Sequence, residues 1–337
     1  MRAFLAPLTV ALGLTLGFSS CSDISSDTGP GGFGQGEIVA DATFLDQIRT
    51  APFEYSFVGT RRVSFHYVDP VGGAQELIYI ESVAADGDGN VSIDPLEMID
   101  PILDPERFEL FRMVQSALEE FFFNHRDFRI RDVALFGSNY RATVTEPDSR
   151  VADRGCVQLR IEAVRKDRNS FLVDVDIETG LILRAREFNA VNRQVGEVVF
   201  ESIFFGEVDP ARFEDVSTTN PVNWRALEDG ETFDLPVGAP ALPPRGFQLL
   251  EERVVTDPLG GEWYELIYGD GSEQMFVFFR LQSVLGDATS VTPDDEVGLF
   301  GIGPWVVAEG VLRGQDVIVL GKLSRSEILT TLESCLN

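Results

Sequence analysis

The chain contains few of the residue types that usually carry chemistry. Its 337 residues include two histidines, His66 and His125, and three cysteines, and lysine occurs only at Lys166 and Lys322. Neither histidine has a second histidine or a cysteine at ligand spacing, and no Ser-His-acid or Cys-His arrangement emerges from the sequence. We therefore predict a protein that is not an enzyme.

Positive charge is also scarce. The chain has 27 Lys and Arg residues against 55 Asp and Glu residues, which gives a formal net charge of −28 at pH 7. Such an acidic surface repels nucleic acid and anionic lipid headgroups, although it leaves room for a local patch of arginine. We expect no nucleic-acid partner.

Beyond the N-terminus, no apolar run is long enough to span a bilayer. Residues 1–20 combine Arg2, an apolar core and small residues before Cys21, which predicts a secretory signal peptide. Residues 18–21 (FSSC) resemble a bacterial lipobox, which implies cleavage before Cys21 and lipid attachment to its thiol; ordinary signal cleavage is the alternative. Residues 21–37 are rich in Ser, Gly and Asp, so we expect a flexible tether. The prediction is a membrane-anchored lipoprotein of the periplasm and cell envelope.

The body of the chain has the spacing of a β-rich protein. A short amphipathic segment at residues 41–51 precedes runs of aromatic and β-branched residues with turn signals between them, including a strand expected at residues 128–136. In residues 171–203, Gly180 separates two extended runs and suits the positive φ of a tight turn. This pattern predicts an antiparallel meander.

One long segment has helical periodicity instead. Residues 105–128 open with Pro105 and Glu106, which suit a first helical turn, and they continue with a wide apolar face. We expect this aromatic helix to lie inside the curled meander and to line a cavity for a ligand, with plain core packing as the alternative. The expected cavity residues are Phe108, Phe111, Phe121 and Phe122.

A Pro-rich acidic stretch divides the body into two parts. We expect a first domain over residues 38–215, a connector over residues 216–242 and a small α+β domain over residues 243–337, which ends in a helix capped by Ser324. The predicted fold class is α+β and mostly antiparallel β. It consists of a half-open β-barrel around the aromatic helix, followed by the small domain.

Residues 86–97 (DGDGNVSIDPLE) place oxygen-bearing side chains at alternate positions, as in a calcium loop. The ligands would be Asp86, Asp88, Asn90 and Glu97. Val91 stands where such loops have glycine, and strand-like runs flank the segment, so an ordinary hairpin turn is the alternative.

Cys156 and Cys335 form an even pair in a chain that we expect to enter an oxidising compartment. A disulfide between them is one expectation. Two buried free thiols are the other.

Several stretches resemble the RseB/MucB family of periplasmic regulators of the sigma-E envelope-stress pathway. They are residues 57–67 (FVGTRRVSFHY), 174–189 (DVDIETGLILRAREFN), 199–205 (VFESIFF), 243–255 (PPRGFQLLEERVV) and 262–279 (EWYELIYGDGSEQMFVFF). The hairpin Thr179–Arg184 is shared with the lipoprotein carriers LolA and LolB, whereas residues 268–271 (YGDG) favour the two-domain regulator.

The resemblance implies a LolA/LolB-like half-barrel that senses envelope lipid or lipoprotein in an apolar cavity. It also implies a small domain that helps to bind the periplasmic segment of a membrane anti-sigma factor and thereby shields it from proteolysis. The chain departs from the family in its lipobox and its acidity. The alternatives are a lipoprotein or lipid carrier or acceptor of the LolA/LolB type, and an anchored scaffold whose half-barrel is filled by its own side chains.

Overall fold

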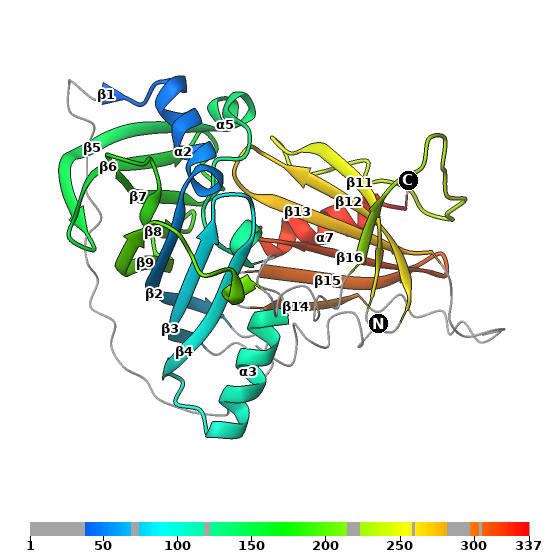
Figure 1. Ribbon diagram of the computed structural model, residues 1–337. Helices are drawn as coiled ribbons and strands as arrows, with labels where there is room; N and C mark the ends of the chain where they lie inside the picture. The colour runs from blue at the N-terminus through cyan, green and yellow to red at the C-terminus, as the bar shows by residue number, and fades with distance from the viewer. Residues whose placement is uncertain are drawn as a thin grey trace.

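The computed structural model describes residues 38–68, 74–117, 122–213, 223–257, 260–281, 297–302 and 305–336. Within these ranges the chain forms two antiparallel sheets (Figure 1). The helices are α2 (Ala42–Glu54), α3 (Pro105–Ala117), α5 (Val133–Asn139) and α7 (Arg325–Ser334), with a π-helix at Phe122–Arg126 and a 3-10 helix at Pro210–Phe213. None of these helices is long and apolar enough to cross a membrane.

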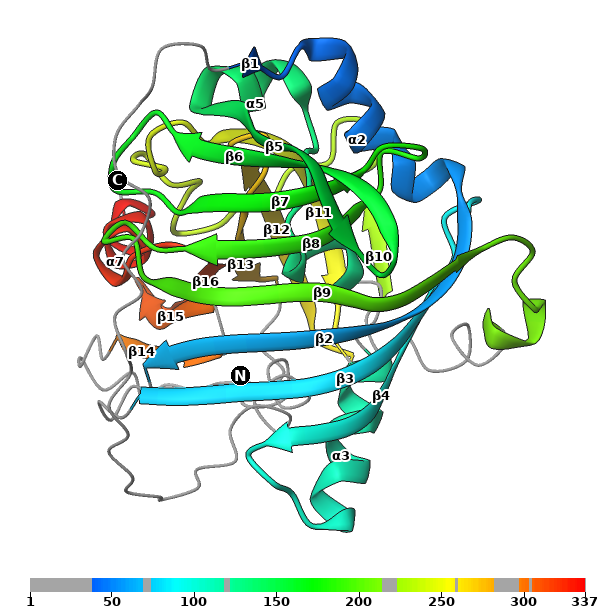
Figure 2. The same cartoon turned by 90° about the vertical axis from the view of Figure 1, so that its left-hand side faces the viewer.

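The first sheet has nine strands in the described part of the chain and is strongly twisted (Figure 2). In spatial order they are β1 (Ile38–Val39), β5 (Tyr140–Val151), β6 (Arg154–Ala163), β7 (Ser170–Asp176), β8 (Ile182–Phe188), β9 (Gln194–Phe205), β2 (Ser56–Val68), β3 (Ala74–Asp86) and β4 (Val91–Asp100). The edge strands β1 and β4 do not pair with each other within these ranges, so the sheet is open. The prediction of a mostly antiparallel β protein is confirmed.

The second sheet has seven strands within the same limits. In spatial order they are β10 (Asn223–Ala226), β11 (Gln248–Thr256), β12 (Glu262–Gly269), β13 (Gln274–Arg280), β16 (Gln315–Gly321), β15 (Trp305–Leu312) and β14 (Gly298–Ile302). Strand β10 pairs with β11, so residues that the sequence placed in the connector begin this sheet.

Both faces of the second sheet are buried. Because side chains alternate along a strand, Phe276 and Phe278 of β13 join a cluster shared with the first sheet, whereas Val277 and Phe279 join the cluster that contains Ile328 of α7. The second sheet therefore lies between the first sheet and α7.

Two local predictions from the sequence are confirmed. Gly180 has φ +79°, and its amide donates to the carbonyl of Asp176 at 2.8 Å, which closes the turn between β7 and β8. Ser324 begins α7 with a capping box, in which its side chain accepts from the amide of Glu327 and the Glu327 carboxylate accepts from the amide of Ser324.

The prediction of one aromatic helix inside the first sheet is wrong. In the described residues the α-helix α3 spans Pro105–Ala117, and it lies beside β4 at the edge of the sheet (Figure 1). Leu110 and Met113 are exposed to 37% and 67%, so the apolar face is narrower than the sequence suggested. Residues 122–126 form a π-helix, whose wider turn departs from the 3.6-residue period on which the prediction rested.

The strand expected at residues 128–136 is also not formed. Residues 128–132 have no regular structure, and α5 begins at Val133 because the carboxylate of Asp132 accepts from the amide of Leu135 at 2.8 Å. Residues 122–131, named the bridging segment below, instead run between the two sheets.

The turn between β12 and β13 is one place where the second sheet meets the first domain. The carbonyl of Gly271 accepts from the amide of Arg131 at 2.8 Å. Gly271 has φ +100°, and a Cβ atom added there would overlap the backbone of Phe136 at the start of α5. Only glycine permits this close approach of two backbones.

We predict that Gly271→Ala lowers the free energy of unfolding by about 2 kcal/mol more than Gly89→Ala. Gly89 is a matched control because it has φ +107° but no atom within 4 Å of an added Cβ. Urea unfolding of the two variants measures the difference. Equal losses would show that the contact at Gly271 contributes nothing beyond the strain of its positive φ.

Candidate functional site

The bridging segment contacts both sheets with aromatic side chains. The ring of Phe128 lies 4.5 Å from that of Phe171 in the first sheet. On the other side, the Phe122 ring lies 6.1 Å from Trp305, and the His125 ring meets Phe276 edge-on at 5.0 Å. The segment therefore forms a layer of its own between the sheets.

A buried charge network holds the segment to the first sheet. Arg126 is 2% exposed, and its guanidinium donates to both carboxylate oxygens of Glu81, at 2.7 and 2.9 Å, and to the hydroxyl of Tyr79 at 2.8 Å. Arg61 of β2 pairs with Glu81 at 2.5 Å and with Asp127 at 2.8 Å. Two guanidinium groups thus face two carboxylates, so the buried network is balanced in charge.

The network fixes its protonation state. Burial alone would raise the pKa of Asp127, but the guanidinium groups of Arg126 and Arg61 hold it well below its usual range. Burial likewise opposes the charge of Arg126, yet Asp127 and Glu81 raise its pKa well above the ordinary value. Asp127 and Arg126 therefore both stay ionised at neutral pH.

Lys322, at the end of β16, connects the second sheet to the segment. Its ammonium donates to the backbone carbonyl of Arg126 at 2.6 Å and to Glu187 of β8 at 3.4 Å, and it lies 3.9 Å from Glu273. The Lys322 side chain is 2% exposed. Burial raises the pKa of Glu273 to about 7, with Lys322 opposing the shift and Glu187 adding to it. The one buried ammonium of Lys322 therefore interacts with two carboxylates and with the backbone of the bridging segment.

The turn between β12 and β13 provides a third attachment. The carboxylate of Asp270 accepts from the hydroxyl of Tyr140 at 2.7 Å, and its carbonyl accepts from the side-chain amide of Asn139 at 2.9 Å. The guanidinium of Arg131 donates to the carbonyl of Ser272 at 2.8 Å. Both ends of the segment are thus tied to the second sheet.

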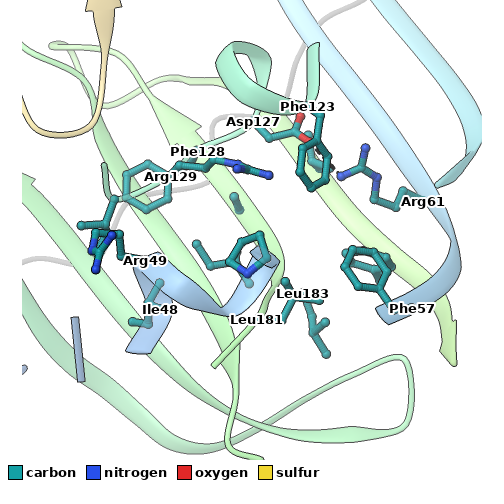
Figure 3. A pocket seen from close by; sticks show the side chains of 16 residues that line it. Ile48, Arg49, Phe57, Arg61, Phe123, Asp127, Phe128, Arg129, Leu181 and Leu183 are labelled. Atoms are coloured by element: carbon teal, nitrogen blue, oxygen red, sulfur yellow. Dashed lines mark hydrogen bonds and ion pairs between the residues drawn. The ribbon is translucent and has the colours of Figure 1, made fainter. Parts of the chain in front are cut away.

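A small apolar cavity lies under the segment, against the inner face of the first sheet (Figure 3). Its volume is about 60 Å³. Phe123, Phe128 and Arg129 of the segment line it together with Leu183 of β8 and Phe200 of β9. Pockets that enclose small organic ligands usually measure about 300–1,000 Å³, so an acyl chain fits here only if the segment moves.

Arg129 lies at one side of this cavity with an unusual environment. Its guanidinium stacks on the Phe123 ring at 3.9 Å and on the Phe53 ring at 5.3 Å. Burial, together with the nearby Arg131, lowers the pKa of Arg129 to about 9. The cavity thus joins an apolar wall to one cation that lacks a carboxylate within ion-pair distance in the described residues.

Part of the chain matches a known protein family. Residues 112–220, which include the bridging segment and strands β5 to β9, match the family model of the MucB/RseB N-terminal domain. This part of the chain belongs to the MucB/RseB family. The prediction of that family, and of a non-catalytic protein, is confirmed. A search of curated proteins found no match.

Solved structures similar to the chain include three of MucB. One is the MucA/MucB complex of Pseudomonas aeruginosa, with 20% identity, a TM-score of 0.49 and coverage of 88% of this chain and 97% of that chain. MucB in complex with MucA(peri) is 20% identical, with a TM-score of 0.48 and coverage of 87% of this chain and 98% of that chain. MucB alone gives 19% identity and 0.49, with 87% and 96% covered.

Of the four aromatic residues predicted from the sequence, the three that are described do not line the cavity. The rings of Phe108 and Phe111 stack on each other, and the Phe111 ring meets that of Tyr79 of β3 edge-on at 5.2 Å. Phe122 contacts Trp305 of the second sheet. Phe121 lies outside the described residues, as do Cys21 and the rest of residues 1–37. The neighbouring Phe123 and Phe128 line the cavity instead.

The proposed calcium loop is a closed hairpin turn between β3 and β4. The carboxylate of Asp86 accepts from the amides of Asp88 and Asn90 and from the Asn90 side chain, at 2.8, 3.0 and 2.5 Å. Glu97 lies further along β4, opposite Ile80. In the described ranges, no three His, Cys, Asp or Glu side chains are grouped as a metal site.

The two cysteines are free thiols in the structure. Cys156 lies in the core cluster shared by the sheets, and Cys335 lies in the cluster beneath α7. Burial raises the pKa of Cys156 to about 11 and that of Cys335 to about 12. The disulfide is therefore not formed, and the alternative of buried thiols describes both residues.

The charged residues that hold the bridging segment in place were not predicted from the sequence. Glu81, Arg61 and Arg126 are common residue types in ordinary strand and helix patterns, so nothing marks them locally. Lys322 did carry a signal, because lysine occurs only twice in a chain whose other basic residues are arginine. A lysine that directly follows a strongly apolar strand is a candidate for a specific polar contact, because lysine is almost never buried unless it is paired.

We predict that Lys322→Met lowers the free energy of unfolding by about 3 kcal/mol or more, because it leaves Glu187 and Glu273 buried without their cation. Lys166→Met is the matched control, since Lys166 is exposed, and should change stability by about 0.5 kcal/mol or less. Chemical denaturation measures both. Similar small losses in the two variants would contradict the role given to Lys322.

Proposed function

We propose that this chain is a MucB/RseB-type regulator of the sigma-E envelope-stress response. It binds the periplasmic segment of a membrane anti-sigma factor and releases that segment when lipid or lipoprotein occupies the cavity under residues 122–131. The observation that carries this proposal is that one segment fills the cavity of the first sheet and contacts the second sheet at the same time.

The partner in this proposal follows the MucB complexes, in which MucB binds MucA and its periplasmic part. Here the partner would be the corresponding anti-sigma factor of the same cell. The two sheets and the segment between them offer a binding surface whose shape depends on how the sheets are held together. A change at the segment would therefore change the affinity for the partner.

The ligand in this proposal is an acyl chain from an envelope lipid or lipoprotein. The cavity wall includes Leu181, Leu183 and Phe200, and its cation at Arg129 suits a carboxylate or phosphate at the end of a chain. An acyl chain would displace Phe123 and Phe128, because the cavity of about 60 Å³ has no room for both. Lipid attachment at Cys21 would keep the protein beside the membrane that supplies the ligand.

The filled cavity favours a regulator over a carrier. A carrier of the LolA/LolB type must hold its cargo through transit, and a site that the protein's own side chains already occupy is poorly suited to that. The same filling is the arrangement expected of an anchored scaffold. The scaffold and the regulator differ in whether the segment moves when lipid is present.

Fluorescence anisotropy of a labelled anti-sigma periplasmic segment, titrated with the full chain, tests the proposal. We expect binding that weakens about tenfold when a lysophospholipid is added below its micelle concentration. Ala185→Val fills part of the cavity, so this variant should bind the anti-sigma periplasmic segment normally, but lipid should weaken that binding less. Ala226→Val, an exposed position on β10, is the matched control and should behave like the original chain.

If the chain does not bind the anti-sigma periplasmic segment, the proposal that it is a regulator is contradicted. Binding that lipid leaves unchanged would favour the scaffold. Transfer of an acylated lipoprotein between vesicles, without binding to the segment, would favour the carrier.

A further inference from the structure

The outer face of the first sheet is not covered by any described helix (Figure 2). Four arginines project from its middle strands: Arg62 from β2, Arg160 from β6, and Arg184 and Arg186 from β8. We name this set the arginine row. It is separate from the cavity, which lies on the inner face.

Strand register places the four side chains on one face. Arg160 pairs with Leu172 of β7, which pairs with Arg186. Arg184 pairs with Val199 of β9, which pairs with Arg62. Residues that face each other across strands share a face of the sheet, so each pair of arginines is two strands apart, roughly 10 Å, with an apolar residue between them.

The row keeps an excess of positive charge. Asp174, which is fully buried, lies 3.6 Å from Arg184, and Glu197 lies 3.7 Å from Arg62. Among the ion pairs of the described residues, none involves Arg160 or Arg186. Glu197 also lies opposite Arg186 in the strand register. The four cations of the row and these two carboxylates sum to 4 − 2 = +2, in a chain whose formal net charge is −28.

Two atoms of the row are buried without a partner. The Nε atoms of Arg184 and Arg186 are buried and have no hydrogen-bond acceptor among the described residues. A buried donor that lacks an acceptor is costly, so a carboxylate that draws these guanidinium groups outward would relieve that cost. Toward β4 the face becomes acidic again, with Glu97 and Asp100 exposed, so the positive region has a boundary.

We propose that the arginine row is a docking surface for an acidic, extended segment of a protein partner, with apolar residues between its carboxylates. Arginine binds carboxylate in a two-pronged geometry and is enriched, together with apolar side chains, at protein interfaces. A membrane is a less suitable partner, because a plane of anionic headgroups would also face the acidic remainder of the chain. A short acidic peptide segment can contact the arginine row without facing the acidic remainder of the surface.

Binding of a labelled twelve-residue peptide of alternating Glu and Ala to the full chain tests this proposal by fluorescence anisotropy. A peptide of alternating Gln and Ala is the neutral control. We expect the acidic peptide to bind at low salt and to bind more weakly as salt screens the charges. Arg160→Glu combined with Arg186→Glu should weaken binding about tenfold or more.

The matched control is Arg245→Glu combined with Arg325→Glu, two exposed arginines outside the first sheet that change the net charge equally. Thermal unfolding checks that each variant folds, and Arg160→Gln combined with Arg186→Gln replaces the charge reversal if it does not. Equal weakening by both double variants, or no preference for the acidic peptide, would overturn the proposal. Binding only to phosphatidylglycerol vesicles, dependent on the row, would also overturn it and assign the surface to lipid.

Discussion

Arg126 connects the two sheets, one through its side chain and the other through its backbone. Its guanidinium is satisfied by Glu81 and Tyr79 of the first sheet, and its backbone carbonyl accepts from Lys322 of the second. A buried charge is costly unless it stays hydrogen-bonded, so neither sheet can move away without leaving a charge unsatisfied. The positions of Phe123 and Phe128 in the cavity follow from this arrangement, since both belong to the same short segment.

This arrangement gives the proposed function its physical basis. The cavity has too little space for an acyl chain while the segment is in place, and the segment's other side is bound to the second sheet. A ligand would therefore compete with the protein's own side chains, and the cost of displacing them would be felt at the contact between sheets. Under the proposed function, sensing and partner binding would be two outcomes of one equilibrium, as thermodynamic coupling requires.

The sequence predicted what depends on neighbours along the chain. The turn at Gly180, the capping box at Ser324 and most strands follow from local pattern. It failed at residues 105–136, where one helix and one strand were expected. The reason is that the conformation there is set by distant partners: Arg126 bonds Glu81 across 45 positions and Lys322 across 196. Periodicity carries no information about such pairs.

Hydrogen–deuterium exchange of the full chain, with and without a lysophospholipid, tests the central claim most directly. The account predicts that amides of residues 122–131 and of the turn at residues 270–273 exchange faster when lipid is present, while β6 and β7 are unchanged. Although Phe128 packs on Phe171 of β7, the backbone amides of β6 and β7 are held by the first sheet's continuous ladder, in which the bridging segment has no strand. Lipid binding that leaves the exchange of residues 122–131 unchanged, or slows it, would contradict the coupling of cavity and sheets.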